Sequence, residues 1–262
     1  MDIDQFEGLK VQALQWVHRA AESVHQIPFF ELYFAIGILA ITTFWFLLLT
    51  RLRKRAECNT IILTGLCGSG KTFIFHQLRD GTPPQQGTVT SMEPNEDTFI
   101  LHSEKTKGGK IRPVRVVDVP GHPRLRPTLD GFFPLTAGIV FVVDSIDFLP
   151  NLRAASEYLY DILTHAHVVK RKIPVLLLCN KVDKEITAHT KEFITKQLEK
   201  EIDKLRSSRT AVSDADISSE FTLGIPGEQF KFSQCQNQVV VKEGSGLTGK
   251  LEELEEFIRQ NV

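Results

Sequence analysis

Eight consecutive residues, Gly65 to Thr72, read G-L-C-G-S-G-K-T and fill every fixed position of a phosphate-binding loop. Glycines let such a loop curl so that successive backbone N–H groups face the α- and β-phosphates of a nucleotide. The lysine then reaches the β- and γ-phosphates, and the threonine hydroxyl ligates Mg²⁺. The nucleotide-binding residues that this pattern predicts are Gly65, Leu66, Cys67, Gly68, Ser69, Gly70, Lys71 and Thr72.

Two shorter motifs follow at the ends of expected strands. From Asp118 to Gly121 the sequence D-V-P-G has a carboxylate that can hold the Mg²⁺ shell through water and a glycine N–H that can sense a γ-phosphate. From Asn180 to Asp183 the sequence N-K-V-D places a carboxylate where it can accept the N1–H and exocyclic amine of guanine, whereas adenine offers an acceptor and no amine at those positions. Lys181 can lay its aliphatic stem across the base, and the asparagine can hold its loop against the phosphate loop.

Each short motif is weak evidence alone, and a glycine-rich turn without nucleotide would also satisfy the first pattern. Found in this order in one domain, the three motifs together predict a guanine-nucleotide site, because ligands of open parallel sheets lie beyond the carboxyl ends of the strands. The predicted cofactors are GTP or GDP with Mg²⁺. The predicted metal contacts at this stage are Thr72 directly and Asp118 through water.

Short apolar runs alternate with helical patterns from about Ala56 onward, and these elements must position the motifs. We expect strands at 59–64, 114–118, 137–144, 173–180 and 239–241, with helices at 72–78, 152–167, 188–205 and 251–260. Nearly continuous β-branched and leucine strands separated by helices indicate an α/β fold with a mainly parallel sheet covered on both faces. The polar segment 207–238 is either a disordered insertion or a partner-binding loop, and Phe221, Phe230 and Phe232 indicate that part of it packs.

The stretch from Leu32 to Thr50 carries no charge. A membrane-spanning helix needs about 20 predominantly apolar residues, so we predict one transmembrane helix at 30–50 after a short lumenal segment at 1–29. A buried core helix is the alternative, but the following domain leaves nothing obvious to bury it. The run begins too far from Met1, and is too long, for a cleaved signal peptide.

The segment before this run is mainly acidic. Four basic residues follow the run: Arg51, Arg53, Lys54 and Arg55. The positive-inside bias therefore predicts a basic juxtamembrane linker at 51–58 and a cytosolic domain at 59–262. The basic residues could also hold anionic lipid headgroups, but a stop-transfer flank explains them without a further function.

The formal net charge of −1 argues against nucleic acid as the main partner, because binding a polyanion usually calls for a basic surplus. The four cysteines, Cys58, Cys67, Cys179 and Cys235, form no C-x-x-C pair and have no histidines at zinc-ligand spacing. A reduced cytosolic domain fits this pattern.

From Asn59 to Val262 the chain resembles the Ras-like small GTPases. Within that superfamily it resembles the beta subunits of the signal recognition particle receptor, through T-V-T-S at 88–91, D-V-P-G-H at 118–122, E-K-E-I-D-K-L-R at 199–206 and F-S-Q at 232–234. This resemblance implies a P-loop GTPase fold anchored in the endoplasmic reticulum membrane. It also implies a GTP-bound domain that grips the receptor's alpha subunit as a heterodimer and so recruits translating ribosomes to the translocation channel.

The resemblance also implies roles for residues outside the three motifs. Thr90 is the expected switch threonine that closes over Mg²⁺ and the γ-phosphate, with Thr88 and Ser91 as neighbouring candidates. His122 stands where many Ras-like proteins carry the glutamine that orients the attacking water. Since no arginine finger is evident, we expect slow intrinsic hydrolysis, and a histidine that contacts a partner is an equal alternative.

Two positions depart from the family pattern. The usual S-A-K loop, whose backbone N–H reads the guanine carbonyl, has no match, and Ser245 is the expected substitute because it follows the last strand. Gly68 stands where the family pattern has an acidic residue, and the phosphate-loop pattern permits either.

Two other functions share these motifs. A trafficking GTPase of the Arf or Sar type would have the same fold, but those proteins attach by a lipid or an amphipathic helix, and Met1-Asp2 excludes myristoylation at residue 2. A tethered scaffold that holds GTP without turnover is the other alternative.

Overall fold

The structure is a computed structural model that describes residues 29–54, 59–82, 84, 87–105, 113–184, 186–213, 223–225 and 227–262. The chain divides into two compact units, Met1–Glu57 and Cys58–Val262. In the first unit the described element is helix α2 (Phe29–Lys54), which includes the uncharged run, while the predicted lumenal segment lies almost wholly outside the described residues. Over the residues that the structure describes, no helix is long and apolar enough to cross a membrane.

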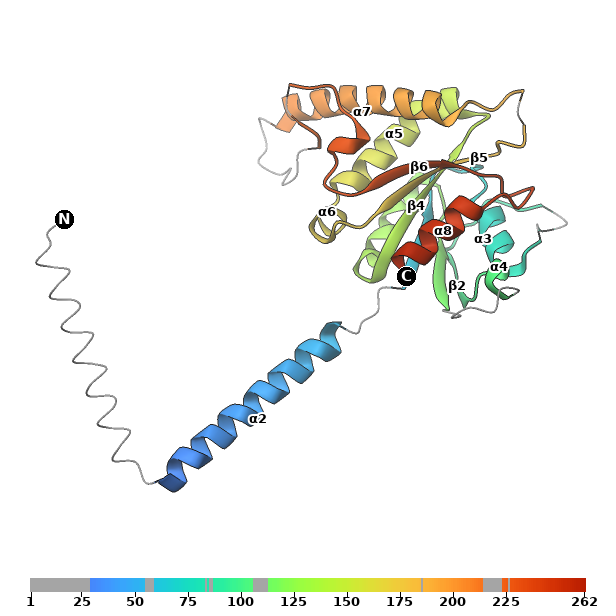
Figure 1. Cartoon of the computed structure of the whole chain (residues 1–262). Coiled ribbons are helices and arrows are strands. Elements are labelled where there is room, and N and C mark those ends of the chain that lie inside the picture. Colours follow the sequence, from blue (N-terminus) through green and yellow to red (C-terminus); the bar gives the residue numbers. More distant parts are fainter. Residues whose placement is uncertain are drawn as a thin grey trace, which may run out of the picture. The chain divides into compact units, whose positions relative to one another are not determined.

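The second unit is built on a six-stranded sheet in the order β2-β3-β1-β4-β5-β6 (Figure 1). The strands are β1 (Thr60–Thr64), β2 (Asn95–Phe99), β3 (Val114–Asp118), β4 (Thr136–Asp144), β5 (Val175–Asn180) and β6 (Val239–Glu243). All neighbours pair in parallel except β2, which is antiparallel to β3 at one edge. Every described residue of β1 and β5 is buried, as expected for strands covered on both faces.

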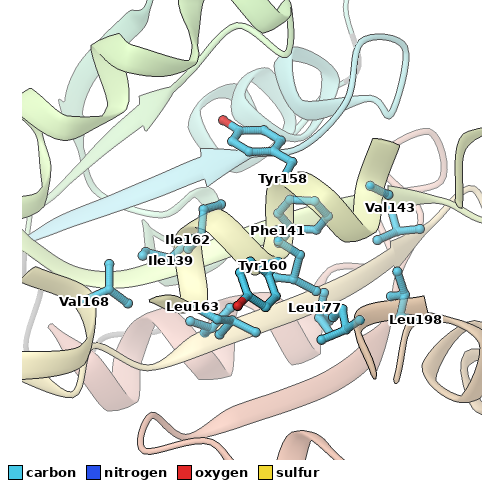
Figure 2. Packing of buried hydrophobic residues seen from close by; sticks show 14 of the residues in the cluster. Ile139, Phe141, Val143, Tyr158, Tyr160, Ile162, Leu163, Val168, Leu177 and Leu198 are labelled. Atoms are coloured by element: carbon cyan, nitrogen blue, oxygen red, sulfur yellow. The ribbon is translucent and has the colours of Figure 1, made fainter. Parts of the chain in front are cut away.

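Helices cover the two faces of the sheet, which confirms the predicted fold class. On one face, α5 (Phe148–Thr164), α6 (Ala166–Arg171) and α7 (Lys191–Ser213) pack over side chains of β4 and β5, among them Phe141, Val143 and Leu177, which Figure 2 labels. On the other face, α3 (Lys71–Asp80) and α8 (Glu252–Asn261) enclose a second cluster that contains Ile61, Val142 and Leu178. Successive residues of β1, β4 and β5 alternate between these two clusters, since strand side chains point to opposite faces.

Two elements differ from the sequence-based expectation. Strand β2 was not expected, because its sequence N-E-D-T-F has four exposed positions and no apolar run. The helix expected at 152–167 begins earlier, at Phe148, and is interrupted at His165. That residue has an extended backbone (φ −66°, ψ 130°) and its Nδ1 accepts the N–H of His167, so α6 starts anew as a separate short helix.

The segments after β3 are short 3-10 helices, η1 (Pro123–Gly131) and η2 (Phe133–Leu135). In η1, Arg126 stacks over the ring of Tyr158 at 4.2 Å from its centroid. The phenol oxygen of Tyr158 lies 2.6 Å from the hydroxyl of Thr64, the last residue of β1. This contact chain therefore joins η1 to the strand that feeds the phosphate loop.

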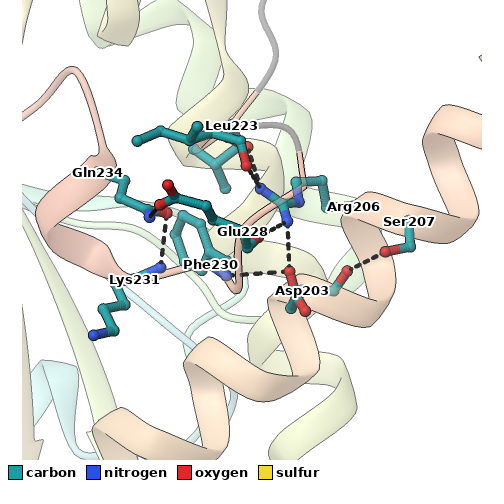
Figure 3. Close-up of polar contacts among 9 residues, drawn as sticks. Asp203, Arg206, Ser207, Leu223, Glu228, Phe230, Lys231 and Gln234 are labelled. Atoms are coloured by element: carbon teal, nitrogen blue, oxygen red, sulfur yellow. Dashed lines mark hydrogen bonds and ion pairs between the residues drawn. The ribbon is translucent and has the colours of Figure 1, made fainter.

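The structure describes residues 207–213, 223–225 and 227–238 of the polar segment. Helix α7 continues past the expected end at Leu205 to Ser213. Beyond it, Arg206 donates to the carbonyls of Leu223, Ile225 and Glu228, as Figure 3 shows in part. Phe230 and Phe232, the latter in η3 (Phe232–Gln234), are buried as predicted, whereas the predicted packing of Phe221 lies outside the described residues.

Candidate nucleotide site

The phosphate loop connects β1 to α3 and needs glycine at specific positions. Gly65 has a φ of 137°, and a Cβ atom there would lie 2.3 Å from the carbonyl oxygen of Val142. Gly70 has a φ of 90°, and a Cβ atom there would lie 2.4 Å from the Asn180 amide nitrogen. Larger residues are therefore excluded by both backbone strain and contact, which explains the glycines of the motif.

Lys71 is the first residue of α3, and the residue is 6% exposed. The ammonium donates to the carbonyl of Leu66 at 2.8 Å. Burial lowers the pKa of Lys71, while the charges of Asp118 and Cys67 act in the opposite direction. The lysine is thus folded back over its own loop, at the helix N-terminus where anions are favoured.

Thr72 and Asp118 meet at the start of α3. The hydroxyl of Thr72 donates to Asp118 Oδ2 at 2.6 Å and lies 3.3 Å from the hydroxyl of Ser91. Asn95 donates to the same carboxylate oxygen and to Ser91, each at 3.2 Å. The other oxygen, Asp118 Oδ1, is buried without a hydrogen-bond partner among the described residues. This orphaned acceptor beside a hydroxyl is what an Mg²⁺ site with a water shell requires.

The base end of the site is built from the end of β5 and the segment after β6. Asn180 donates to the carbonyl of Ser69 at 2.7 Å, and its Oδ1 accepts the N–H of Gly246 at 3.0 Å. Asp183 accepts the hydroxyl of Ser245 at 2.6 Å. The Asn180 amide thus ties the N-K-V-D loop to the phosphate loop, as the sequence predicts.

Ser245 reaches this site in a different way from the predicted one. The residue is 1% exposed, and its backbone N–H donates to the carbonyl of Lys250 at 3.0 Å. The residue therefore holds Asp183 through its hydroxyl, while its N–H is already engaged across the turn. A contact between that N–H and a guanine carbonyl stays a prediction, and it requires the bond to Lys250 to break.

One cavity of about 400 Å³ joins these groups. The predicted residues that line it are Cys67, Gly68, Gly70, Lys71, Thr72, Thr88, Thr90, Ser91, Asp118, Gly121, Asn180, Lys181 and Asp183. Four other predicted residues support the loop or the base end without lining the cavity; they are Gly65, Leu66, Ser69 and Ser245. Three motifs that lie far apart in the sequence are therefore brought to one place.

Gly121 and His122 both follow Asp118, but of the two only Gly121 lines the cavity. A Cβ atom at Gly121 would lie 2.4 Å from the carbonyl oxygen of Gly65 and 2.5 Å from the nitrogen of Cys67, so the D-V-P-G turn presses against the phosphate loop. His122 is exposed and is not among the residues that line the cavity. Its imidazole accepts the N–H of Arg124 and caps η1. A role for His122 in orienting water stays a prediction.

Thr90 lines the cavity, but the hydroxyl that contacts Thr72 belongs to Ser91. The prediction that Thr90 closes over Mg²⁺ and the γ-phosphate also remains to be tested.

The sequence did not reveal several contributors. Asp144 ends β4 and pairs with Lys181, Asn95 contacts the carboxylate of Asp118, and Gly246 and Ile146 line the cavity. The position of Asp144 at a strand end was a usable signal, because the other strand-end residues were selected by that rule. Asn95 lies on the strand that the sequence does not reveal.

The described cysteines, Cys67, Cys179 and Cys235, are free thiols, and Cys58 lies outside the described residues. Burial raises the pKa of both Cys179 and Cys235 to about 12, so these thiols stay protonated at neutral pH. Among the described residues, no three His, Cys, Asp or Glu side chains gather around a common metal position. Mg²⁺ is compatible with this, since it usually keeps several waters and takes few protein ligands.

Comparison with known proteins decides the family. The signal recognition particle receptor beta subunit family matches residues 56–239. The chain belongs to this family. The mouse signal recognition particle receptor subunit beta is 31% identical over 85% of this chain and 83% of its own length.

Solved structures of signal recognition particle receptors share the fold. A chain from the structure of the mammalian SRP receptor is 30% identical, with a TM-score of 0.67 over 78% of this chain and 100% of that chain. The SRb-GTP/SRX complex of Chaetomium thermophilum has a TM-score of 0.59 over 78% of this chain and 98% of that one. At 22% identity, the second likeness supports the fold alone.

Proposed function

We propose that this beta-family chain is the subunit of the signal recognition particle receptor that binds guanine nucleotide with Mg²⁺. The observation that carries the proposal is the single cavity where the phosphate loop, Asp118 and Asp183 converge. The carboxylate of Asp183 offers two acceptors to the adjacent N1–H and amine of guanine. The Ser245 hydroxyl, which donates to one of its oxygens, fixes the orientation of this carboxylate.

The other end of the cavity suits the phosphates and the metal. Backbone N–H groups of the phosphate loop and the Lys71 ammonium would hold the phosphate oxygens. The Thr72 hydroxyl would ligate Mg²⁺, and Asp118 would accept from the metal's water shell through its free Oδ1. When bound, the metal supplies positive charge that neutralises the β- and γ-phosphates.

The proposed partner is the receptor's alpha subunit, with which the chain would form a heterodimer. Val89 and Met92 support a protein contact here, because they are 88% and 72% exposed on the segment that also lines the nucleotide cavity. A ligand in the cavity can thus bias the shape of an exposed apolar surface. In a solved structure from Chaetomium thermophilum, SRb with GTP is found in a complex with SRX. Contact with the ribosome or the translocation channel would be made through the assembled receptor.

We also propose, on sequence alone, that 30–50 anchors the chain in the endoplasmic reticulum membrane as a single-pass helix. The uncharged run and the basic residues at 51–58 support this orientation, with 1–29 lumenal and 59–262 cytosolic. The GTP-bound domain would then hold the alpha subunit at that membrane for co-translational protein targeting. The segment within 207–238 would be available to a partner.

Turnover is the open part of the function. We propose slow intrinsic GTP hydrolysis, in which His122 would orient the attacking water and Thr90 would close over Mg²⁺ and the γ-phosphate. A scaffold that holds GTP without hydrolysis is favoured by one observation, the imidazole of His122 that caps η1 rather than facing the cavity. Release of phosphate over many turnovers, measured with and without the alpha subunit, separates the two functions, and no release under either condition selects the scaffold.

Affinity purification of the tagged full chain from detergent-solubilised membranes tests the receptor assignment. We expect the alpha subunit to copurify in the presence of GTP and to be lost with Lys71→Ala, which removes the phosphate-binding ammonium. The control Lys200→Ala changes an exposed lysine of α7 and should retain the partner. Absence of the alpha subunit from the wild-type preparation would contradict the assignment.

A further inference from the structure

Asp144 is the last residue of β4, and it lies beside the base end of the site. It pairs in register with Asn180, the last residue of β5. The next residue, Lys181, has a left-handed backbone with a φ of 69°, and its ammonium lies 2.5 Å from Asp144 Oδ2. The carboxylate is 14% exposed and the lysine side chain 34% exposed, so this ion pair is partly shielded from water.

The second oxygen of the same carboxylate orders a turn. Asp144 Oδ1 accepts the N–H of Ile146 at 3.0 Å and the N–H of Asp147 at 3.3 Å. Ile146 and Lys181 both line the nucleotide cavity, although they come from different strand ends. One carboxylate therefore braces two parts of the cavity wall.

Lys71 and Lys181, two of the lysines that line the cavity, have different partners. Lys71 donates to the neutral carbonyl of Leu66 and keeps its charge for phosphate oxygens. Lys181 is paired with a carboxylate, which neutralises its charge locally and draws the ammonium away from the phosphates. The methylene chain of Lys181 is then the part that can contact a ligand. Because its ammonium is held by Asp144, this chain can lie flat on a planar base.

Fixing the tip also changes the cost of binding. A free lysine side chain loses rotamer freedom when a ligand immobilises it, and this loss weakens binding. In this chain the ion pair with Asp144 restricts the side chain before any ligand arrives. The restriction is a form of preorganisation, which strengthens binding without a new contact to the ligand.

We propose that Asp144 is a positioning residue for base recognition, which acts through Lys181 and does not touch the nucleotide. This inference rests on the proposed function, since it assigns a role within the guanine-nucleotide site. Asp144→Asn separates the two tasks of the carboxylate, because an asparagine keeps the Oδ1 acceptor of the turn and loses the charge that holds the lysine.

Equilibrium and stopped-flow binding of a fluorescent GDP analogue to the full chain tests the proposal. We expect Asp144→Asn to weaken affinity about 3- to 10-fold, mainly through faster dissociation, because the lysine must then be ordered by the ligand. Asp144→Ala should weaken it further, since it also removes the turn acceptor. The control Asp147→Asn removes an exposed neighbouring carboxylate that makes no capping hydrogen bond, and it should bind like the wild type.

A double-mutant cycle with Lys181→Met gives the readout that a merely structural role would not produce. Methionine keeps an apolar stem and has no ammonium for Asp144 to hold. We therefore expect Asp144→Asn to have no further effect on affinity in the Lys181→Met background. An equal loss in both backgrounds, or no loss in the wild-type background, overturns the inference. Failure of the wild type to bind GDP overturns the proposed function as well, so the two failures are distinguishable.

Discussion

At the scale of single residues, the proposed selection of guanine depends on the two carboxylate oxygens of Asp183. The N-K-V-D motif predicts this residue from the sequence, and the structure adds the hydroxyl of Ser245 that orients it. The motif is predictable because strand ends in parallel sheets meet at the ligand. The support from Ser245 is not predictable in the same way, because it depends on how the turn up to Lys250 closes.

Asp183→Asn should shift nucleotide preference from guanine toward xanthine. An amide presents one donor and one acceptor, which matches the carbonyl and the N–H that xanthine offers and mismatches the two donors of guanine. We expect GTP affinity to fall on the order of 10²-fold or more, because buried polar groups are left unpaired, while xanthosine triphosphate binds more tightly than to the wild type.

Competition between the two triphosphates measures this change. The matched control is Asp161→Asn, which alters an exposed carboxylate of α5 that pairs with Arg209, and it should leave GTP preference intact. Unchanged GTP selectivity in Asp183→Asn would remove this residue from the base site.

Two residues that contact the motifs are not predicted by any sequence motif. Asp144 and Asn95 each contact a motif residue through register and pairing rather than through sequence proximity. Neither lies within a recognisable motif, so their roles require the arrangement of β4 beside β5 and of β2 beside β3.

At the scale of elements, the sequence predicts the buried strands well and the edge strand not at all. The apolar runs of β1, β4 and β5 are covered on both faces, so nearly every position is apolar and the pattern is strong. Strand β2 is antiparallel at the sheet edge and mostly exposed, so its residues carry no apolar signal. Tertiary pairing with β3, which cannot be read from the segment itself, makes it a strand.

At the same scale, Arg206 and Asp203 of α7 form a clamp on the segment 223–230, and the free energy that this clamp contributes to folding can be predicted. Arg206 is 15% exposed at its side chain and donates to carbonyls of the segment that returns toward β6. Its partner Asp203 also accepts the N–H of Phe230, so the arginine and the aspartate hold both the backbone and an aromatic anchor (Figure 3). Arg206 is therefore one of the main polar contacts that hold this segment against α7.

Arg206→Ala should destabilise the chain by about 1.5–3 kcal/mol, since it leaves charge-assisted hydrogen bonds unmade. Urea denaturation measures the change, and hydrogen exchange of residues 227–234 should rise in parallel. Arg153→Ala is the matched control, because that arginine is 79% exposed and pairs with Glu157 at the surface. Its cost should be within about 1 kcal/mol. A loss for Arg206→Ala no larger than that of the control would contradict the clamp.

At the scale of the whole molecule, the residues predicted to bind the nucleotide lie at the carboxyl ends of the parallel strands of the Cys58–Val262 unit. Two apolar clusters fix β1, β4 and β5 from both faces, and the strand ends they position carry Gly65, Asp144 and Asn180. A site spread over distant parts of the sequence is thus held by the core rather than by the loops alone.

We propose that this cavity selects guanine nucleotide over adenine nucleotide. The most direct test is a calorimetric titration of the nucleotide-free wild-type chain with Mg²⁺-GTP and, separately, with Mg²⁺-ATP. We expect GTP to bind at least about 100-fold more tightly than ATP, since adenine presents an acceptor nitrogen and a C–H group where guanine presents the two donors that Asp183 can accept. Equal affinity for the two nucleotides, or no binding of GTP, would contradict it.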